Sequence, residues 1–460
     1  MKKRKNTDET MRGCALLQRI SSGLSSITAT LLFVVSYRNG LSYLESKTKV
    51  LELYDRFGAR VAVCPEWSGR VMTSTGDGLD GTSHGLIHVA GIEAEDPALG
   101  FFGGEDQFSL SPESGPLSLY DEPKPASSTA RHHVHRLRGA QEGPFMVDTV
   151  PPDPIRMRRA VRITNLVGAT FDFDIVRTVR LLSSADVDRI FGNPVAVSLE
   201  QADVSFVGFE TINTLHNHGS PLVRKSGLVS MRIRSMFNSG QETVAIVPFR
   251  VGNDAELGPS VCADFFGTSP HGRLRILPQA ALLRADCKFR CQVGVSRKRV
   301  LPFLGAVDFR IGLMTLTTFS LPQEPWEHDY LSNAYCETAD DATTDFISTR
   351  EYFQRESVPR QTNETKEEEE NALDGGSWDK LYSGEVVRAY NHGPSTPGET
   401  PTARYYEFDV FSPAKELNRG ESLTHHQFTA HINADNQTLA FIARTVFGVD
   451  YDHVYDKIIR

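Results

Sequence analysis

The chain has 460 residues, of which 40% are hydrophobic, 23% charged and 9% aromatic. This composition is typical of a globular protein and excludes collagen-like, coiled-coil and wholly disordered chains. The formal net charge is −9, so the chain lacks the dense basic field that nonspecific nucleic-acid binding needs. No nucleic-acid partner is therefore predicted, and a neutral or weakly polar small ligand fits the charge balance better.

The first 45 residues are predicted to form a leader or a disordered segment, with residues 46–460 as a single domain. Four basic residues at positions 2–5 precede a short apolar run at 29–35. A secretory signal needs about 7–15 continuous apolar residues, and a membrane span needs about 20. No stable membrane span is predicted. A signal, a tail and a wrongly assigned start remain open, so the protein is cytoplasmic or exported, and its oligomeric state is also open.

From about residue 51 the pattern indicates β-structure. Alternation is clearest in FDFDIVRTVRLL at 171–182, where Phe171, Phe173 and Ile175 would share one face of a strand. Many short strands separated by Gly- and Pro-rich turns predict an antiparallel β-sandwich or barrel. The other predicted strands are 59–64, 69–75, 160–165, 204–213, 228–236, 243–249, 288–295, 314–321, 405–411 and 422–432.

Only two helices are predicted. The first covers 184–191, with Ser184 as its N-cap, and the second covers 436–446 and is ended by Gly448. Residues 338–372 interrupt the β-pattern with an acidic, low-complexity stretch that includes four consecutive glutamates at 367–370. This stretch is predicted to be a surface insertion, because a long loop adds little closure entropy.

Several segments resemble an uncharacterised bacterial family of domains of unknown function, of the type found in Planctomycetes and Bacteroidetes. The resemblance runs from about residue 51 to the end and skips the acidic insertion. It implies the antiparallel β-supersandwich of the galactose mutarotase-like group. The segments are VAVCPEWSGRVMTST (61–75), FGGEDQFSLSPESG (102–115), VGFETINTLHNHG (207–219), ETVAIVPFR (242–250), AELGPSVCADFFG (255–267), LYSGEVVRAYNHGP (381–394) and YEFDVFSPAKELNRGESLTHHQFTAHI (406–432).

The resemblance also implies a sugar chemistry that needs no cofactor. An aldose 1-epimerase opens the ring with a base that removes the anomeric proton and an acid that protonates the ring oxygen. By this resemblance Glu407 is the predicted base, and His216 or His218 the predicted acid. The alternatives are a strand glutamate that faces solvent and two histidines in a surface turn.

The predicted substrate-binding residues are Glu105, Asp106, Tyr390, Asn391 and Arg70. A glycine pair precedes the two acids and would let backbone approach a ligand closely, although the acids could instead cap a turn. A tyrosine and an asparagine suit sugar recognition through ring stacking and a two-pronged amide, although the Gly-Pro that follows is also typical of a structural turn.

One departure from the family pattern affects this site. The family is expected to carry an Arg and a Trp after Gly-Gly-Glu-Asp. This chain reads Gln107, Ser109, Ser111, Ser114 and Pro116 over the same stretch. A ring that stacks on a sugar and a cation that binds its hydroxyls are both missing, which puts any activity of this segment in doubt.

No metal site is predicted. The histidines of RHHVHR at 131–136 are flanked by arginines that repel a cation, and His425-His426 lacks a carboxylate partner in sequence. No nucleophile elbow, P-loop or dinucleotide-binding fingerprint occurs. The leading hypothesis is therefore a carbohydrate-binding protein, with aldose 1-epimerase as its possible activity. The alternatives are a noncatalytic carbohydrate-binding or scaffold protein, and a glycoside hydrolase or lyase with paired carboxylates.

Overall fold

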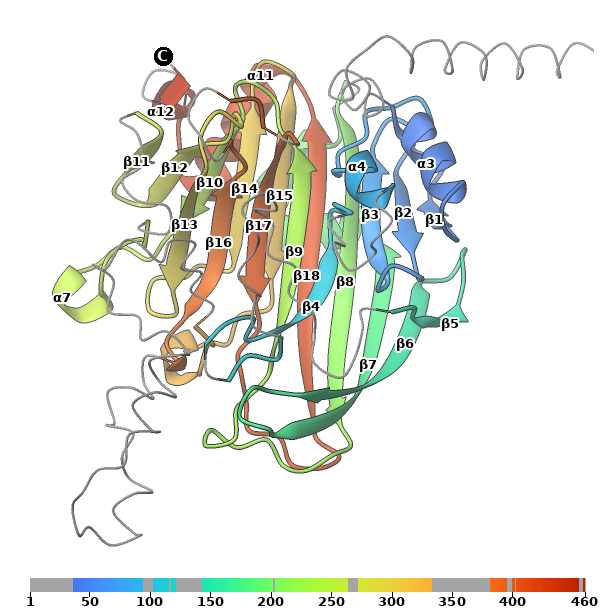
Figure 1. Ribbon diagram of the computed structural model, residues 1–460. Helices are drawn as coiled ribbons and strands as arrows, with labels where there is room; N and C mark the ends of the chain where they lie inside the picture. Colours follow the sequence, from blue (N-terminus) through green and yellow to red (C-terminus); the bar gives the residue numbers. More distant parts are fainter. Residues whose placement is uncertain are drawn as a thin grey trace, which may run out of the picture.

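The computed structural model describes residues 36–93, 102–115, 117–120, 143–201, 203–263, 272–332, 381–394, 399–401, 403–454 and 458–459. Two antiparallel sheets lie one in front of the other, and a smaller sheet lies to one side (Figure 1). The predicted mainly β, antiparallel architecture with a C-terminal helix is confirmed. The predicted acidic insertion at 338–372 lies outside the described residues.

Within the described ranges the large sheet has ten strands and the small sheet has five, and both are antiparallel throughout. In spatial order the large sheet runs β11 (Leu274–Ile276), β12 (Ala280–Arg284), β10 (Val244–Pro248), β14 (Phe303–Asp308), β15 (Leu313–Phe319), β18 (Ser422–Asn433), β8 (Ser205–Asn217), β7 (Thr170–Leu181), β6 (Ile155–Thr164) and β5 (Met146–Thr149). The small sheet runs β13 (Cys291–Ser296), β16 (Glu385–Asn391), β17 (Tyr405–Phe411), β9 (Ser230–Asn238) and β4 (Gln107–Ser111). The third sheet is β1 (Leu51–Tyr54), β2 (Arg60–Cys64) and β3 (Arg70–Thr75).

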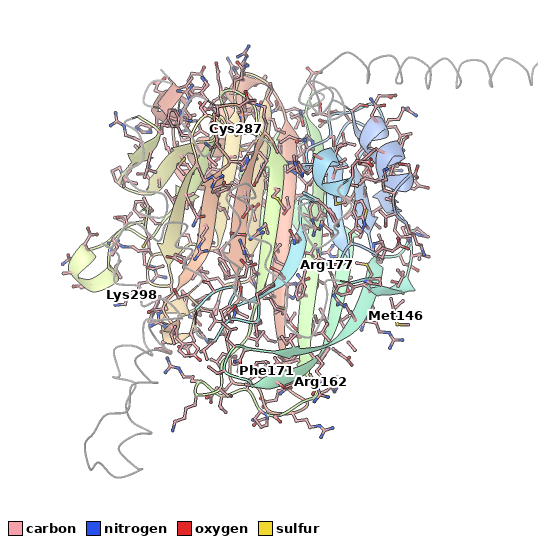
Figure 2. All side chains as sticks on the ribbon, in the orientation of Figure 1. Met146, Arg162, Phe171, Arg177, Cys287 and Lys298 are labelled. Atoms are coloured by element: carbon pink, nitrogen blue, oxygen red, sulfur yellow. The ribbon has the colours of Figure 1, made fainter. Side chains whose placement is uncertain are left out.

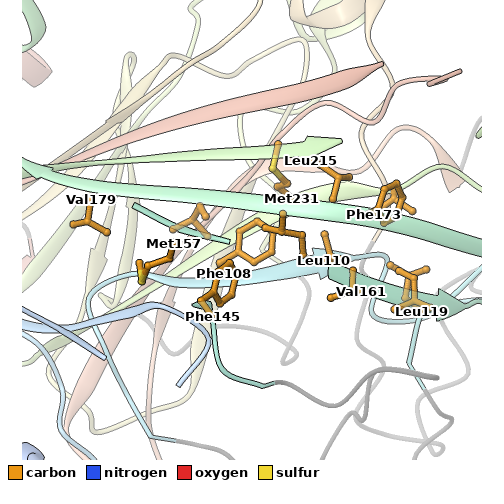
Figure 3. Packing of buried hydrophobic residues seen from close by; sticks show 14 of the residues in the cluster. Phe108, Leu110, Leu119, Phe145, Met157, Val161, Phe173, Val179, Leu215 and Met231 are labelled. Carbon is orange, nitrogen blue, oxygen red and sulfur yellow. The ribbon is translucent and has the colours of Figure 1, made fainter. Parts of the chain in front are cut away.

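Side-chain alternation explains how the two main sheets pack. Along β7 the residues alternate between buried and half-buried, with Phe171, Phe173 and Ile175 on the buried side as predicted. Phe173 packs there with Phe108 and Met231 of the small sheet (Figure 3). Burial of such side chains stabilises the fold by about 1.5–3 kcal/mol each.

The same alternation decides which face of β17 is available for chemistry. Phe408 and Val410 pack with Leu304 of the large sheet, between the two sheets. Glu407 and Asp409 therefore point to the other side of the small sheet, away from the large sheet. This side is called the outer face of the small sheet below.

Helices cover part of the far side of the large sheet. Leu439 and Ile442 of α11 (Asn436–Phe447) pack on Ile246 and Leu316, and α11 ends at Gly448 in the left-handed conformation, as predicted. The helix α5 (Ser184–Phe191) is also found, but Ser183 and not Ser184 is its N-cap. Further short helices were not predicted: α4 (Val89–Ile92), α6 (Asn193–Ser198), α7 (Asp254–Leu257), α12 (Tyr451–Val454) and the 3-10 helix η2 (Pro325–Glu327).

The predicted boundary of the leader at residue 45 does not match the fold. The helix α3 (Tyr37–Glu45) lies within the predicted leader, yet Tyr37 and Leu44 are fully buried. They pack against Ala62 and Met72 of the third sheet. The folded unit thus begins before residue 46, because an amphipathic helix covers that sheet. Among the described residues, no helix is long and apolar enough to cross a membrane.

Candidate functional site

The outer face of the small sheet carries charged residues in successive rows across the strands. Tyr390 of β16 lies directly opposite Glu407 of β17. One row along, Asp409 lies opposite Arg388 on one side and Arg234 of β9 on the other. Directly opposed residues of antiparallel strands share a face, with Cβ atoms about 4.5–5.5 Å apart. The register thus brings Tyr390, Glu407 and Asp409 onto one surface.

Two arginines of β9 bind the carboxylates of this face. Arg232 donates to both oxygens of Asp409, over 2.8 and 2.5 Å, and forms an ion pair with Glu113. Arg234 Nε lies 3.1 Å from Glu407 Oε1. Glu407 is 3.6 Å from the second guanidinium, that of Arg232. Arg232 is therefore held mainly by Asp409 and Glu113, while Glu407 relies on Arg234.

This arrangement separates the proton affinities of the two neighbouring carboxyl groups. Burial raises the pKa of Glu407 to about 7, although Arg234 opposes the shift. Burial also acts on Asp409, but the Arg232 and Arg234 guanidiniums outweigh it and bring the pKa of Asp409 below its ordinary value. A carboxyl group with a pKa near neutrality can both accept and donate a proton, as acid–base chemistry requires.

A tyrosine–histidine pair lies beside Glu407. The hydroxyl of Tyr390 is hydrogen-bonded to His392 Nδ1 over 3.1 Å. The His392 ring stacks on Tyr405, with ring centroids 4.6 Å apart. His392 follows the end of β16 and is buried. The pair thus holds a phenol in place on the same face as the carboxyl group.

Asn391 points to the opposite side of β16 from Tyr390. Its amide nitrogen donates to the Phe289 carbonyl over 2.6 Å, and its oxygen accepts from the Cys287 amide over 3.1 Å. The side chain therefore holds the turn before β13. Asn391 does not join Tyr390 on the outer face.

Glu105 and Asp106 lie between the sheets and are fully buried. Glu105 accepts hydrogen bonds from the Ser74 amide (2.5 Å) and hydroxyl (2.8 Å), and it contacts His431 Nε2 over 3.1 Å. Asp106 forms an ion pair with Arg177, which lies within the body of the molecule (Figure 2). Glu105 and Asp106, which were predicted to bind substrate, are thus separated from Glu407, the predicted base, by the small sheet.

The glycine pair before these acids serves packing between chain segments. Gly103 has φ of +86°, and a Cβ on it would lie 2.1 Å from the Leu86 carbonyl oxygen. A Cβ on Gly104 would lie 2.7 Å from Arg70. Arg70 is itself buried and donates to the Gly103 carbonyl over 2.7 Å. The groups that closely approach the backbone of the two glycines are thus Leu86 and Arg70, and not the ligand that the sequence predicted.

The two predicted acid histidines lie on the other side of the molecule. Leu215 of β8 packs between the sheets, so His216 points away from the small sheet. His216 Nδ1 is hydrogen-bonded to Ser422 over 2.5 Å, and exposed His218 pairs with Asp174 over 2.9 Å. Both sheets therefore separate these histidines from Glu407. The structure does not bring the predicted base and either predicted acid together.

Sequence reasoning missed Arg232, Arg234, Asp409, Glu113 and His392. A signal existed for three of them, because Arg232 and Arg234 alternate in SMRIRSMFN and Asp409 follows Glu407 by two residues. This spacing places both members of each pair on one face of a strand. Glu113 follows β4 in a loop and carries no periodic signal.

The described residues contain no group of three or more His, Cys, Asp or Glu side chains arranged to hold a metal ion. His425 is buried, and His426 Nδ1 lies 2.7 Å from Glu210. The histidines at 131–136 lie outside the described residues.

Comparison with known proteins gives a family and a set of weak structural likenesses. The model of a family described as "Family of unknown function (DUF6786)" matches residues 35–351 and 363–458. No curated protein matches the sequence.

Solved structures similar to this chain include galactose mutarotase-like proteins. The Slr1438 protein of Synechocystis sp. PCC 6803 has a TM-score of 0.43 and 11% identity, covering 84% of this chain and 97% of its own. A putative aldose 1-epimerase of Escherichia coli K12 has a TM-score of 0.41 and 9% identity, covering 83% and 98%. A galactose mutarotase-like protein of Lactobacillus casei ATCC 334 has a TM-score of 0.41 and 8% identity, covering 84% and 99%.

Proposed function

We propose that this chain, which belongs to the DUF6786 family of unknown function, binds a carbohydrate on the outer face of the small sheet and interconverts its anomers. The observation that carries the proposal is Glu407, a carboxyl group whose pKa is raised to about 7 on a face rich in hydrogen-bonding groups. Arginine and carboxylate side chains together suit sugar hydroxyls, since the first donates and the second accepts hydrogen bonds. The resemblance of the sequence to an uncharacterised family, which implies the fold of the mutarotase-like group, is in line with the same chemistry.

Anomer interconversion needs two proton transfers at neighbouring oxygens. In the proposed reaction ionised Glu407 takes the proton of the anomeric hydroxyl, the bond between the anomeric carbon and the ring oxygen breaks, and the Tyr390–His392 pair protonates the ring oxygen. Closure on the other face of the carbonyl returns both protons to their donors. Tyr390 lies directly across the strands from Glu407, and this position supports the assignment of the two proton transfers to these neighbouring groups.

Exchange spectroscopy by NMR on purified protein tests this function with unsubstituted aldoses. We expect anomer exchange faster than in buffer, a loss of roughly 10²–10⁴-fold on Glu407→Gln, and retained sugar binding. Asp148→Asn removes a carboxylate from the edge strand β5 of the other sheet and serves as the matched control. Exchange at the buffer rate for every aldose would remove the epimerase activity, and absence of binding as well would remove the carbohydrate proposal.

A noncatalytic carbohydrate-binding protein is the second candidate, and a specific observation favours it. Gln107 and Ser109 stand where the family pattern suggests an Arg and a Trp, and they lie opposite Arg234 and Arg232 on the same outer face. The guanidiniums of β9 replace the missing cation there, but Gln107 and Ser109 provide no ring for stacking. Sugar binding by titration without accelerated exchange, and unchanged by Glu407→Gln, would support this candidate.

A further inference from the structure

Three carboxyl groups and two guanidiniums meet around Glu407, so their charges do not balance. Glu113, Glu407 and Asp409 each lie within 3.6 Å of a nitrogen of Arg232, and each also lies within 3.6 Å of Arg234. The third arginine of this face, Arg388, lies opposite Asp409 and acts on it, but Arg388 is also paired with Glu385 over 2.8 Å, so that the pair adds no net charge. One carboxylate is therefore in excess. In a buried cluster an excess charge is removed by keeping a proton on one of the groups.

The hydrogen bonds decide which carboxyl group keeps that proton. Asp409 accepts two hydrogen bonds from Arg232, and Glu113 accepts a third. No hydrogen bond of good geometry from either arginine reaches Glu407 in the described part of the chain. Glu407 has only the ion-pair contacts with Arg234 Nε at 3.1 Å and with Arg232 at 3.6 Å. Charge-assisted hydrogen bonds stabilise the ionised form of the acids that accept them. Glu407 is thus the weakest held anion of the three.

We propose that Asp409 and Glu113, by holding Arg232, are positioning residues that keep a single exchangeable proton on Glu407. The inference deepens the proposed function, because it explains how one carboxyl group serves both directions of a proton transfer. The inference rests on the proposed function only in assigning the proton to sugar chemistry. The raised pKa of Glu407 and the lowered pKa of Asp409 agree with the charge count.

Other groups face Glu407 from the neighbouring strands but leave the count unchanged. Tyr390 lies directly opposite Glu407 on β16. Burial raises the pKa of Tyr405, on the same strand as Glu407, well above its ordinary value, so Tyr405 adds no charge at neutral pH. His392 is hydrogen-bonded to Tyr390. Among the described residues, Arg290 acts on Tyr405, whereas the cations that act on Glu407 are Arg234 and Arg232.

Titration of the protein without sugar tests the inference separately from the proposed function. Isotope-labelled glutamate carboxyl groups can be followed by NMR or infrared spectroscopy, with Glu407→Gln identifying the signal of Glu407. We expect Glu407 to titrate near neutrality in the unsubstituted protein. Asp409→Asn should lower that midpoint by about one pH unit or more, since it removes an anion and releases Arg232 toward Glu407.

Glu113→Gln provides the second variant and should lower the midpoint in the same direction. It decides the question alone if Asp409→Asn does not fold. Asp148→Asn removes one charge from the other sheet and should leave the midpoint unchanged. A Glu407 signal that is already ionised at pH 5 in the unsubstituted protein would overturn the inference. So would a midpoint that neither substitution lowers, even if sugar binding and anomer exchange are found.

Discussion

Glu407 lies directly opposite Tyr390 in the antiparallel pairing of β17 with β16. The two residues are 17 positions apart in sequence, and the register alone places a buried carboxyl group and a phenol on the same face. Neighbouring groups that act in one proton-transfer step are coupled, so their substitutions are not expected to act independently.

A double-substitution cycle tests this coupling. We expect Tyr390→Phe to slow anomer exchange by about tenfold and Glu407→Gln by about 10²–10⁴-fold. The double variant should be scarcely slower than Glu407→Gln, because the acid has no function once the base is lost. Tyr54→Phe, at an exposed tyrosine of the third sheet, is the control. Fully multiplicative losses would show that Tyr390 acts independently of Glu407.

The buried ion pair of Asp106 with Arg177 is expected to stabilise the packing of the sheets. Both side chains are 0% exposed, and Arg177 also donates to Asn213 over 2.5 Å. Asp106→Asn should lower the free energy of unfolding by about 3–5 kcal/mol, because an unpaired guanidinium remains between the sheets. Denaturant unfolding measures this loss.

The surface pair Arg162 and Asp172 provides the comparison for that measurement. Its side chains are 75% and 40% exposed and 3.6 Å apart, and Arg162 lies at the margin of the molecule (Figure 2). Asp172→Asn should change the free energy of unfolding by no more than about 1 kcal/mol. Equal effects of the two substitutions would contradict the role given to Asp106.

His84 should make the protein less stable in mild acid. It is buried, stacks on His431 with centroids 4.3 Å apart, and has no hydrogen-bond partner for either ring nitrogen among the described residues. Burial, together with His431, holds the pKa of His84 well below the ordinary 6.5. Below pH 6.5 the unfolded chain therefore takes up a proton that the folded chain refuses, and stability falls by up to about 1.4 kcal/mol per pH unit.

His84→Phe keeps the stacking and removes the titration. The difference in unfolding free energy between the unsubstituted protein and this variant should change steadily between pH 6.5 and 5, in the direction of a relative gain for the variant. The raised pKa of Glu407 makes the protein more stable as the pH falls over the same range, opposite to the effect of His84. Because Glu407 is present in both proteins, its effect cancels in the difference. A constant difference would mean that His84 takes up its proton equally readily in the folded and unfolded states.

Gly103 should not tolerate a side chain. Gly103→Ala places a Cβ against the Leu86 carbonyl at a positive φ, and we expect a loss of at least about 1–3 kcal/mol in unfolding free energy. Gly258 has a similar φ of +75° but nothing within 4 Å of its Cβ position. Gly258→Ala therefore measures the backbone strain alone. If both variants lose the same stability, the approach of Leu86 has no importance.

The strands and the two predicted helices follow from local sequence. The alternation of buried and half-buried residues in FDFDIVRTVRLL and the end of α11 at Gly448 depend only on residues that are close in sequence. The unpredicted helix α3 shows the limit of this reasoning, because Tyr37 and Leu44 become a core only when the third sheet is present.

That Glu407 and Asp409 share one face follows from the local sequence, because a strand repeats every two residues. Which strands flank them depends on the fold, which brings Arg232 and Arg234 to these acids and leaves His216 and His218 behind the large sheet. Pairing between distant strands depends on the burial of whole faces, which no single segment encodes. For the same reason Glu105 and Asp106, acidic and adjacent to glycines, became interior links between the sheets.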